Sequence, residues 1–363
     1  MKRTDCLPAL LPAGLLLVLL LCFPREMTQG VRDALHVCGT SLITSLFPFF
    51  VLCTFTVKSG LANRLGRPAD RVMRTLFRLP GQAASAVLLG LCGGYPVGTR
   101  MTAQLYEHGA LTKTQAERMC LFCVSAGPAF TVGAVGAGML CSRSAGRVLF
   151  CSLTLSAVTT GLLLRFADTP AEPRTLPTCR TSGAARSFCE AVADAGESIL
   201  SVCAWVLLFS GVGAAAEKLP EALYLPFACL SEVTNGCRTA ASHALSLPLI
   251  AAVLGFGGFA VHCQVLPSVT ACGVRVSRFL AFRAVHAALA AVYCEVLLRL
   301  FPQVQPVIWL QNGVRLLPYS ASAPASAALL ATAAVFIWQT SEPKSDNFDK
   351  KLNKILKNVK KTT

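Results

Sequence analysis

The sequence Gly93-Gly94-Tyr95-Pro96-Val97-Gly98 ends an apolar run, residues 82–98, that is too short to cross a lipid bilayer. A crossing helix needs about 20 apolar residues, so this run predicts one arm of a re-entrant hairpin. A broken helix in hydrocarbon exposes backbone N–H and C=O groups, which persist only where protein or a polar cavity satisfies them. The glycine-rich break therefore indicates a polar site inside a membrane protein.

The composition of the whole chain excludes a soluble globular class. Of its 363 residues, 54% are apolar and 14% are charged, whereas a soluble domain carries about 25% charged residues. The net charge of +15 fits the cytoplasmic loops of a membrane protein, which are rich in Lys and Arg. We therefore expect contact with membrane lipids and no nucleic-acid partner.

The second half of the chain repeats the order of features found around the first break. Phe49–Leu65 aligns with Cys203–Leu219 without a gap, and each stretch is followed by a short interrupted half-span. A longer interrupted segment comes next in each half, with breaks at Ala126-Gly127-Pro128 and at Gly255-Phe256-Gly257-Gly258. Interrupted segments at matching places in two halves are typical of transporters built from inverted repeats.

The charges that follow the paired helices predict opposite orientations for the two halves. Six basic residues against one acid, Asp70, follow the first helix, whereas Glu217, Lys218 and Glu221 follow the second. Because basic loops stay in the cytoplasm, the first of these loops is predicted to be cytoplasmic. Its apolar residues predict an interfacial helix that is interrupted at Gly66 and Pro68.

The fold class predicted from these features is an all-α polytopic membrane protein with about eight transmembrane helices and two re-entrant hairpins in an inverted repeat. The predicted spans are Leu7–Phe23, Leu35–Val57, Met119–Leu140, Arg147–Phe166, Ile199–Ala216, Leu245–Val269, Val285–Leu300 and Ala323–Trp338. This threading leaves the cluster of Arg275, Arg278 and Arg283 in the cytoplasm.

The chain divides into six predicted regions. Residues 1–34 hold the first transmembrane helix and a connector, 35–166 the first repeat, 167–187 a cytoplasmic linker, 188–300 the second repeat, 301–340 a loop and the last transmembrane helix, and 341–363 a basic tail. The tail is either an amphipathic helix on the anionic cytoplasmic leaflet or a solvated disordered segment.

The breaks are the predicted binding site for a small anionic solute. A half-helix that starts at a break points its positive dipole end at the site, which suits a carboxylate or phosphate, and Arg100 adds a bidentate fork. Glu232 is an acid inside an apolar half-span, which indicates either a cavity role or a position near the outer surface. His262 and Gln264 face the same side only if their segment is unwound. The alternative role for each glycine is close helix packing.

The sequence lacks a catalytic arrangement, so we expect no enzyme activity and no cofactor. It contains no HExxH, no GxSxG in a suitable setting and no P-loop. Its 17 cysteines are predicted to be reduced packing residues, because most of them lie inside apolar runs. The CxxC at Cys120 and Cys123 has no second pair and no nearby His cluster, so no metal site is expected.

The motifs at the breaks resemble a known family. The stretch from Gly94 to Arg100, with its continuation to Arg118, is similar to the signature of the sporulation integral membrane protein YlbJ family, within the nucleoside-recognition or gate-domain group. The stretches 232–236 and 256–264 resemble that family's second-half motifs. One departure is Ser125, at a place before the proline-containing break where family members tend to carry Asn.

The resemblance implies a transport core like that of concentrative nucleoside carriers, and a role in moving dipicolinic acid from the mother cell towards the forespore. It also implies a bacterial cell membrane as the location, specifically the mother-cell-derived forespore membrane. The alternatives are a nucleoside-type carrier and a non-transporting assembly protein of the spore envelope. The predicted solute-binding residues are Gly94, Tyr95, Pro96, Gly98, Arg100, Ser125, Gly127, Pro128, Glu232, Asn235, Gly257, Gly258, His262 and Gln264.

Overall fold

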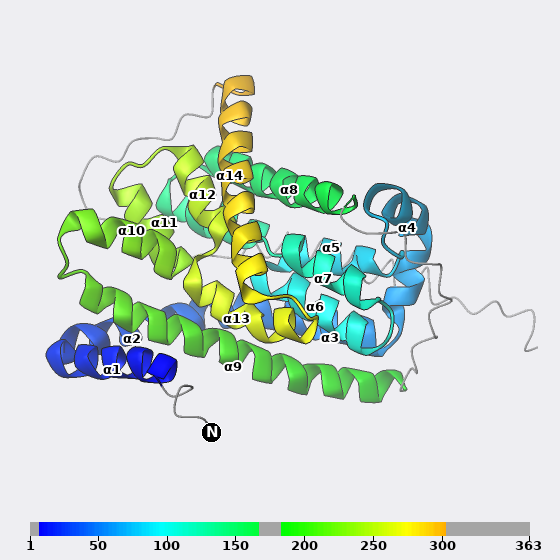
Figure 1. Cartoon of the computed structure of the whole chain (residues 1–363), viewed down its shortest axis with the longest axis horizontal. Coiled ribbons are helices and arrows are strands. Elements are labelled where there is room, and N and C mark those ends of the chain that lie inside the picture. Colours follow the sequence, from blue (N-terminus) through cyan, green and yellow to red (C-terminus); the bar gives the residue numbers. More distant parts are fainter. Residues whose placement is uncertain (1–6, 167–182, 303–363) are drawn as a thin grey trace, which may run out of the picture. The chain divides into compact units, whose positions relative to one another are not determined.

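The computed structural model describes residues 7–166 and 183–302, and every regular element in them is a helix. The first half comprises α1 (Leu7–Cys22), α2 (Pro24–Val37), η2 (Cys38–Leu42), α3 (Ile43–Lys58), α4 (Leu61–Phe77), α5 (Ala83–Gly93), α6 (Tyr95–Glu107), α7 (Lys113–Phe122), η3 (Ala129–Met139) and α8 (Arg143–Leu164). The second half comprises α9 (Ala184–Ala216), α10 (Glu221–Ser231), α11 (Val233–Ser242), α12 (Leu247–Phe256), α13 (Gly258–Ala271) and α14 (Val276–Leu300). The predicted all-helical class is confirmed for these residues (Figure 1).

Four helical segments of the described chain are long and apolar enough to cross a membrane: Arg143–Leu164, Ala184–Ala216, Leu247–Ala271 and Val276–Leu300. Two bent pairs, residues 13–40 and 43–77, raise the number to six if each pair counts as one span. The polytopic class is therefore confirmed, and the described residues alone supply four to six candidate spans. The predicted span Met119–Leu140 consists of α7 and η3 with a break between them. The predicted span Ala323–Trp338, the tail and most of the linker lie outside the described residues.

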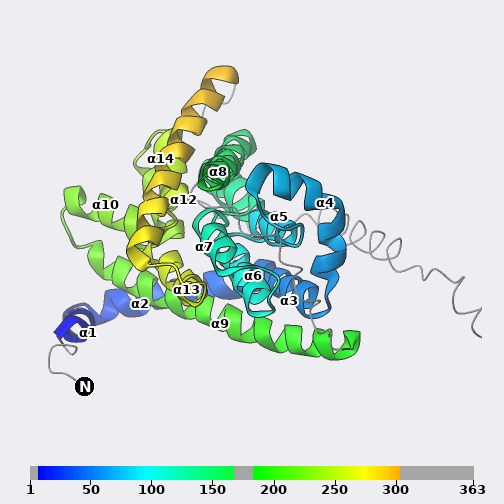
Figure 2. The same ribbon diagram turned by 45° about the vertical axis from the view of Figure 1, so that its right-hand side comes forward.

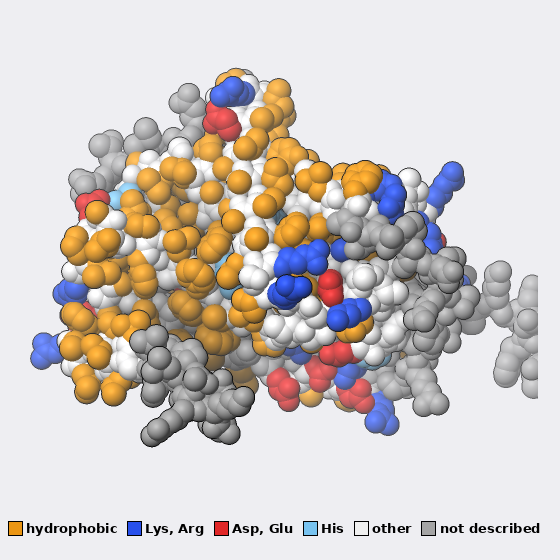
Figure 3. All heavy atoms as spheres, in the orientation of Figure 1, with side chains coloured by type: hydrophobic (Ala, Val, Ile, Leu, Met, Phe, Trp, Pro, Cys, Tyr) orange, Lys and Arg blue, Asp and Glu red, His pale blue; other side chains and the backbone are white. Residues whose placement is uncertain are grey.

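Hydrophobic side chains gather over the left and central parts of the face shown in Figure 3. Among the exposed large apolar residues are Leu88 on α5, Leu163 on α8, Leu200 on α9 and Leu249 on α12. Water would disfavour an apolar surface of this extent, whereas lipid chains would not. In Figures 1 and 2, α14 runs across the direction of α9.

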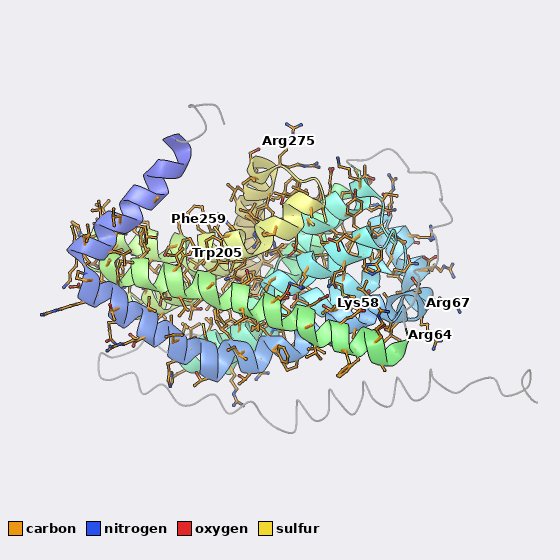
Figure 4. All side chains as sticks on the ribbon, turned by 90° about the horizontal axis from the view of Figure 1, so that it is seen from below. Lys58, Arg64, Arg67, Trp205, Phe259 and Arg275 are labelled. Atoms are coloured by element: carbon orange, nitrogen blue, oxygen red, sulfur yellow. The ribbon has the colours of Figure 1, made fainter. Side chains whose placement is uncertain are left out.

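The helices α2 and α3 run along α9 in the opposite direction. Lys58, at the end of α3, pairs with Glu190 (3.2 Å) and Asp194 (3.0 Å) in the early part of α9, and Figure 4 shows Lys58 beside that helix. A Cβ placed on Gly211, late in α9, would lie 3.6 Å from Cε of Met27 in α2. The chain from α2 to α3 is therefore antiparallel to α9, as the opposite loop charges predict.

The basic segment after α3 differs from its prediction because its helix is not interrupted. Helix α4 runs through Gly66 and Pro68 from Leu61 to Phe77. A Cβ at Gly66 would lie 2.5 Å from the backbone nitrogen of Gln82, so this glycine allows close packing rather than a break. The exposed arginines of α4 include Arg64 and Arg67, which Figure 4 places at the same end of α9 as Lys58.

Candidate functional site

The tip of the first hairpin lies against the break between α7 and η3. Gly94 joins α5 to α6 with a φ of +94°, a conformation that glycine adopts without steric cost. A Cβ on Gly127 would lie 2.6 Å from the carbonyl oxygen of Cys92 and 3.1 Å from the nitrogen of Gly94. A Cβ on Gly98 would overlap the carbonyl oxygen of Cys123. Two backbone segments approach each other so closely here that only residues without a side chain fit.

The second pair of breaks meets the first through Tyr95 and Gly258. The Tyr95 hydroxyl donates to the carbonyl oxygen of Leu254 in α12 (2.7 Å), and its ring carbon Cε1 lies 3.2 Å from a Cβ placed on Gly257. A Cβ on Gly258 would lie 3.1 Å from the nitrogen of Val233 at the tip of the second hairpin. All four interruptions therefore converge on one region.

Arg283 of α14 ties two of these breaks together. It is fully buried, and its Nη1 donates to the carbonyl oxygen of Val124 (2.5 Å), between α7 and η3. Its Nε donates to Phe256 (3.1 Å) and its Nη2 to Gly255, both at the end of α12. Nη1 also contacts Nδ1 of His286 (3.2 Å). The prediction that Arg283 belongs to a cytoplasmic basic cluster is therefore wrong, because this side chain points into the protein.

Glu232 is buried and caps α11. Its carboxylate oxygens accept the backbone N–H groups of Thr234 (2.9 Å) and Asn235 (2.8 Å), and 3% of the residue is exposed. A carboxylate at a helix N-terminus is stabilised by free N–H groups and by the positive end of the helix dipole. The protein's own anion thus occupies the N-terminus of α11.

Several buried polar atoms of the described chain have no hydrogen-bond partner, and two of them belong to residues at the breaks. The first is Oγ of Ser125, in the break between α7 and η3, and the second is Nδ1 of His262 in α13. The Nε2 of His262 lies 2.8 Å from the carbonyl oxygen of Phe256, which can only accept, so Nε2 carries the proton. A buried polar atom without a partner is costly, and a bound solute would offer these two atoms partners.

Several predicted site residues lie elsewhere or point away from the breaks. Arg100 donates a hydrogen bond to the carbonyl oxygen of Asp194 in α9 (3.0 Å), and its guanidinium lies over the ring of Phe50 in α3. Both contacts are with α9 and α3 rather than with a break. Asn235 accepts from Arg238 (2.9 Å). Because α13 is helical from Gly258, His262 and Gln264 do not face the same side.

The remaining predicted residues lie at the breaks. The buried ones are Gly94, Tyr95, Gly98, Gly127, Gly257 and Gly258, and the half-buried ones are Pro96 and Pro128. Arg283 was absent from the predicted set, although an arginine next to an apolar run was a signal for it. That signal was missed because the predicted span began at Val285, whereas α14 begins at Val276.

No group of three or more His, Cys, Asp or Glu side chains in the described chain could hold a metal ion. The Cys120 and Cys123 thiols are free and buried. Of the cysteines expected to be packing residues, Cys53, Cys203 and Cys294 are buried. In contrast, Cys22, Cys92 and Cys151 are exposed on the helical surface.

Comparison with known proteins supports the class indicated by this geometry. The Gate family, described as nucleoside recognition, matches residues 40–143. The chain is 24% identical to the Sporulation integral membrane protein YlbJ of Bacillus subtilis (strain 168), over 76% of this chain and 78% of that protein. It is also 34% identical to the Uncharacterized protein BpOF4_10220 of Alkalihalophilus pseudofirmus, over 21% of this chain and 16% of that protein. No solved structure matches.

The resemblance predicted from the motifs at the breaks is therefore confirmed. The matched region, residues 40–143, contains α3 to η3, and with them the first hairpin and the break between α7 and η3. The chain is an integral membrane protein whose residues 40–143 match the Gate family, described as nucleoside recognition.

Proposed function

We propose that this protein is a membrane carrier for a small solute that binds where the four helix interruptions meet. The observation that supports the proposal is the convergence itself: segments far apart in the sequence bring their breaks into contact through Gly127, Tyr95 and Gly258. In carriers with inverted repeats, discontinuous helices form the substrate site near the middle of the bilayer.

The first candidate solute is a small anionic aromatic compound, dipicolinic acid. The helices α6, η3 and α13 all begin at the breaks, and a helix N-terminus favours a carboxylate. The likeness to a sporulation protein supports a role in spore formation, with the forespore membrane as the proposed location. Arg100 is a weaker candidate for the carboxylate ligand than the N-termini, since its recorded contacts are with α9 and α3.

The second candidate is a nucleoside, favoured by the description of the matching Gate family. The unpartnered Ser125 hydroxyl and His262 Nδ1 also suit a solute with neutral hydroxyl and amide groups. Both candidates use the same breaks, so they differ in the solute and not in the position of the site.

Uptake by proteoliposomes tests the proposal. Purified protein in vesicles should accumulate labelled dipicolinate faster than empty vesicles do, and unlabelled dipicolinate should compete more strongly than uridine. The opposite order of competition would favour the nucleoside carrier. If neither solute is transported and neither raises the melting temperature of the purified protein, the carrier proposal fails and a spore-envelope assembly role becomes the better explanation.

A further inference from the structure

Three backbone carbonyl groups from two helix breaks point at the same side chain. The carbonyl of Val124 follows the end of α7, and those of Gly255 and Phe256 lie at the end of α12. The C-terminal end of a helix carries partial negative charge. In carriers with broken helices, unwound carbonyls and half-helix C-termini are the groups that coordinate a coupling Na⁺ or H⁺.

In this protein a side-chain cation, the guanidinium of Arg283, lies among these carbonyls. We propose that the guanidinium of Arg283 is a resident cation that fills the carbonyl cage, so that no free metal cation binds there. The cage is defined as the carbonyl oxygens of Val124, Gly255 and Phe256. The inference that transport proceeds without a metal cation at the cage rests on the proposed carrier function, whereas the hydrogen bonds of the cage do not depend on that function.

The burial of Arg283 shows that the carbonyls compensate its charge. The side chain is fully buried, and burial of an uncompensated charge is strongly unfavourable. Within the described residues, all of its hydrogen-bond partners are neutral: the three cage carbonyls and Nδ1 of His286. No carboxylate in that part of the chain forms an ion pair with it, so the dipoles of the broken segments balance the charge.

One of the three cage oxygens, that of Phe256, has no capacity left for a second cation. The oxygen of Phe256 already accepts from Nε of Arg283 (3.1 Å) and from Nε2 of His262 (2.8 Å), which uses both of its lone pairs. The guanidinium is also nearly saturated, because four of its five N–H groups have partners. Arg283 therefore holds the breaks together and cannot offer a bidentate fork to a solute.

Thermal unfolding of the purified full chain in detergent tests the cage without any solute. In Arg283→Ala the three carbonyls lose their donors, so the melting temperature should fall, and millimolar guanidinium chloride or NaCl should recover at least half of that loss. Choline chloride at the same concentration should recover none. The matched control is Arg278→Ala, since Arg278 is a partly exposed arginine on the same helix that pairs with Glu117; neither salt should change its melting temperature relative to choline chloride.

Wild-type protein provides the second test, which does not require the variant to fold. Its melting temperature, and its uptake in vesicles, should be the same in NaCl as in choline chloride. Saturable stabilisation of the wild type by Na⁺, or uptake driven by a Na⁺ gradient, would overturn the resident-cation proposal. So would a folded Arg283→Ala that neither guanidinium nor Na⁺ stabilises. Failure of uptake in every salt, with rescue of the variant intact, would instead count against the carrier function alone.

Discussion

Ser125 carries a polar group that the fold of the described residues leaves without a partner. Its side chain is buried, and its hydroxyl has no hydrogen-bond partner in the described chain, which costs about 1–3 kcal/mol. A fold-stabilising role would require a partner. The hydroxyl is therefore better explained by a solute that binds beside it at the break between α7 and η3.

Replacement of this hydroxyl separates binding from stability. Ser125→Ala should leave the melting temperature unchanged or raise it, and should lower the affinity for the transported solute by roughly 2- to 10-fold, the value of one hydrogen bond. The matched control is Ser152→Ala, because Ser152 is equally buried but donates to Val148 in its own helix (2.7 Å). Uptake kinetics and thermal unfolding should be measured on both. A Ser125→Ala protein with normal affinity would remove Ser125 from the site.

Glu232 and Arg283 show how charged residues are accommodated at the same breaks. Glu232 is bound by two backbone N–H groups at the start of α11, and Arg283 by carbonyls at the end of α12 and beside α7. Each charge thus meets the helix end of opposite sign. Both residues are best described as internal ligands of broken helices, and this role explains why charges are tolerated there.

At the scale of helices, the first hairpin depends on close packing at Gly98. This residue lies in the first turn of α6, and a Cβ there would overlap the carbonyl oxygen of Cys123. The position of the hairpin tip against the break between α7 and η3 therefore requires a residue without a side chain.

Gly98→Ala should push α6 away from this break. Overpacking of this kind costs about 1–3 kcal/mol, so the melting temperature should fall and uptake should be lost with it. Gly196→Ala is the control, because nothing lies within 4 Å of its Cβ position on α9, and alanine favours a helix over glycine. A Gly98→Ala protein with wild-type stability and uptake would show that the hairpin tip is not held as described.

At the scale of the whole chain, α9 sets the membrane orientation. The basic α4 follows Lys58, which pairs with Glu190 and Asp194 in the early part of α9. The positive-inside rule therefore predicts that the start of α9 lies on the cytoplasmic side together with α4. With 33 residues, α9 is about 50 Å long, which exceeds the roughly 30 Å of the hydrocarbon core.

Epitope tags test this orientation in a bacterial host that inserts the protein into its plasma membrane. A tag inserted between Pro173 and Arg174, in the predicted linker, should be reached by antibody only after cells are permeabilised. A tag inserted after Lys218, beyond the end of α9, should be reached on intact spheroplasts. Accessibility of both tags from the same side would contradict a single crossing by α9.

The class of protein and the order of its breaks follow from the amino-acid sequence. Lipid requires long apolar helices, and Gly and Pro interrupt helices through local backbone geometry. Apolar helices and their interruptions both depend on short stretches of sequence. The breaks near Gly94, Gly127, Glu232 and Gly257 could therefore be predicted. The continuity of α4 through Pro68 could not, because packing of Gly66 against Gln82 overrides the local signal.

The partners of the breaks were decided only by tertiary structure. Arg283 contacts Val124 across 159 positions of sequence, and no local pattern encodes such a pairing. Arg100 follows the glycine-rich break immediately, yet its donor group meets α9. A hydrogen bond depends on direction and on distances of a few ångströms, and helix packing sets these quantities. Sequence spacing therefore located the interruptions, and the packing of distant helices selected the side chains that satisfy them.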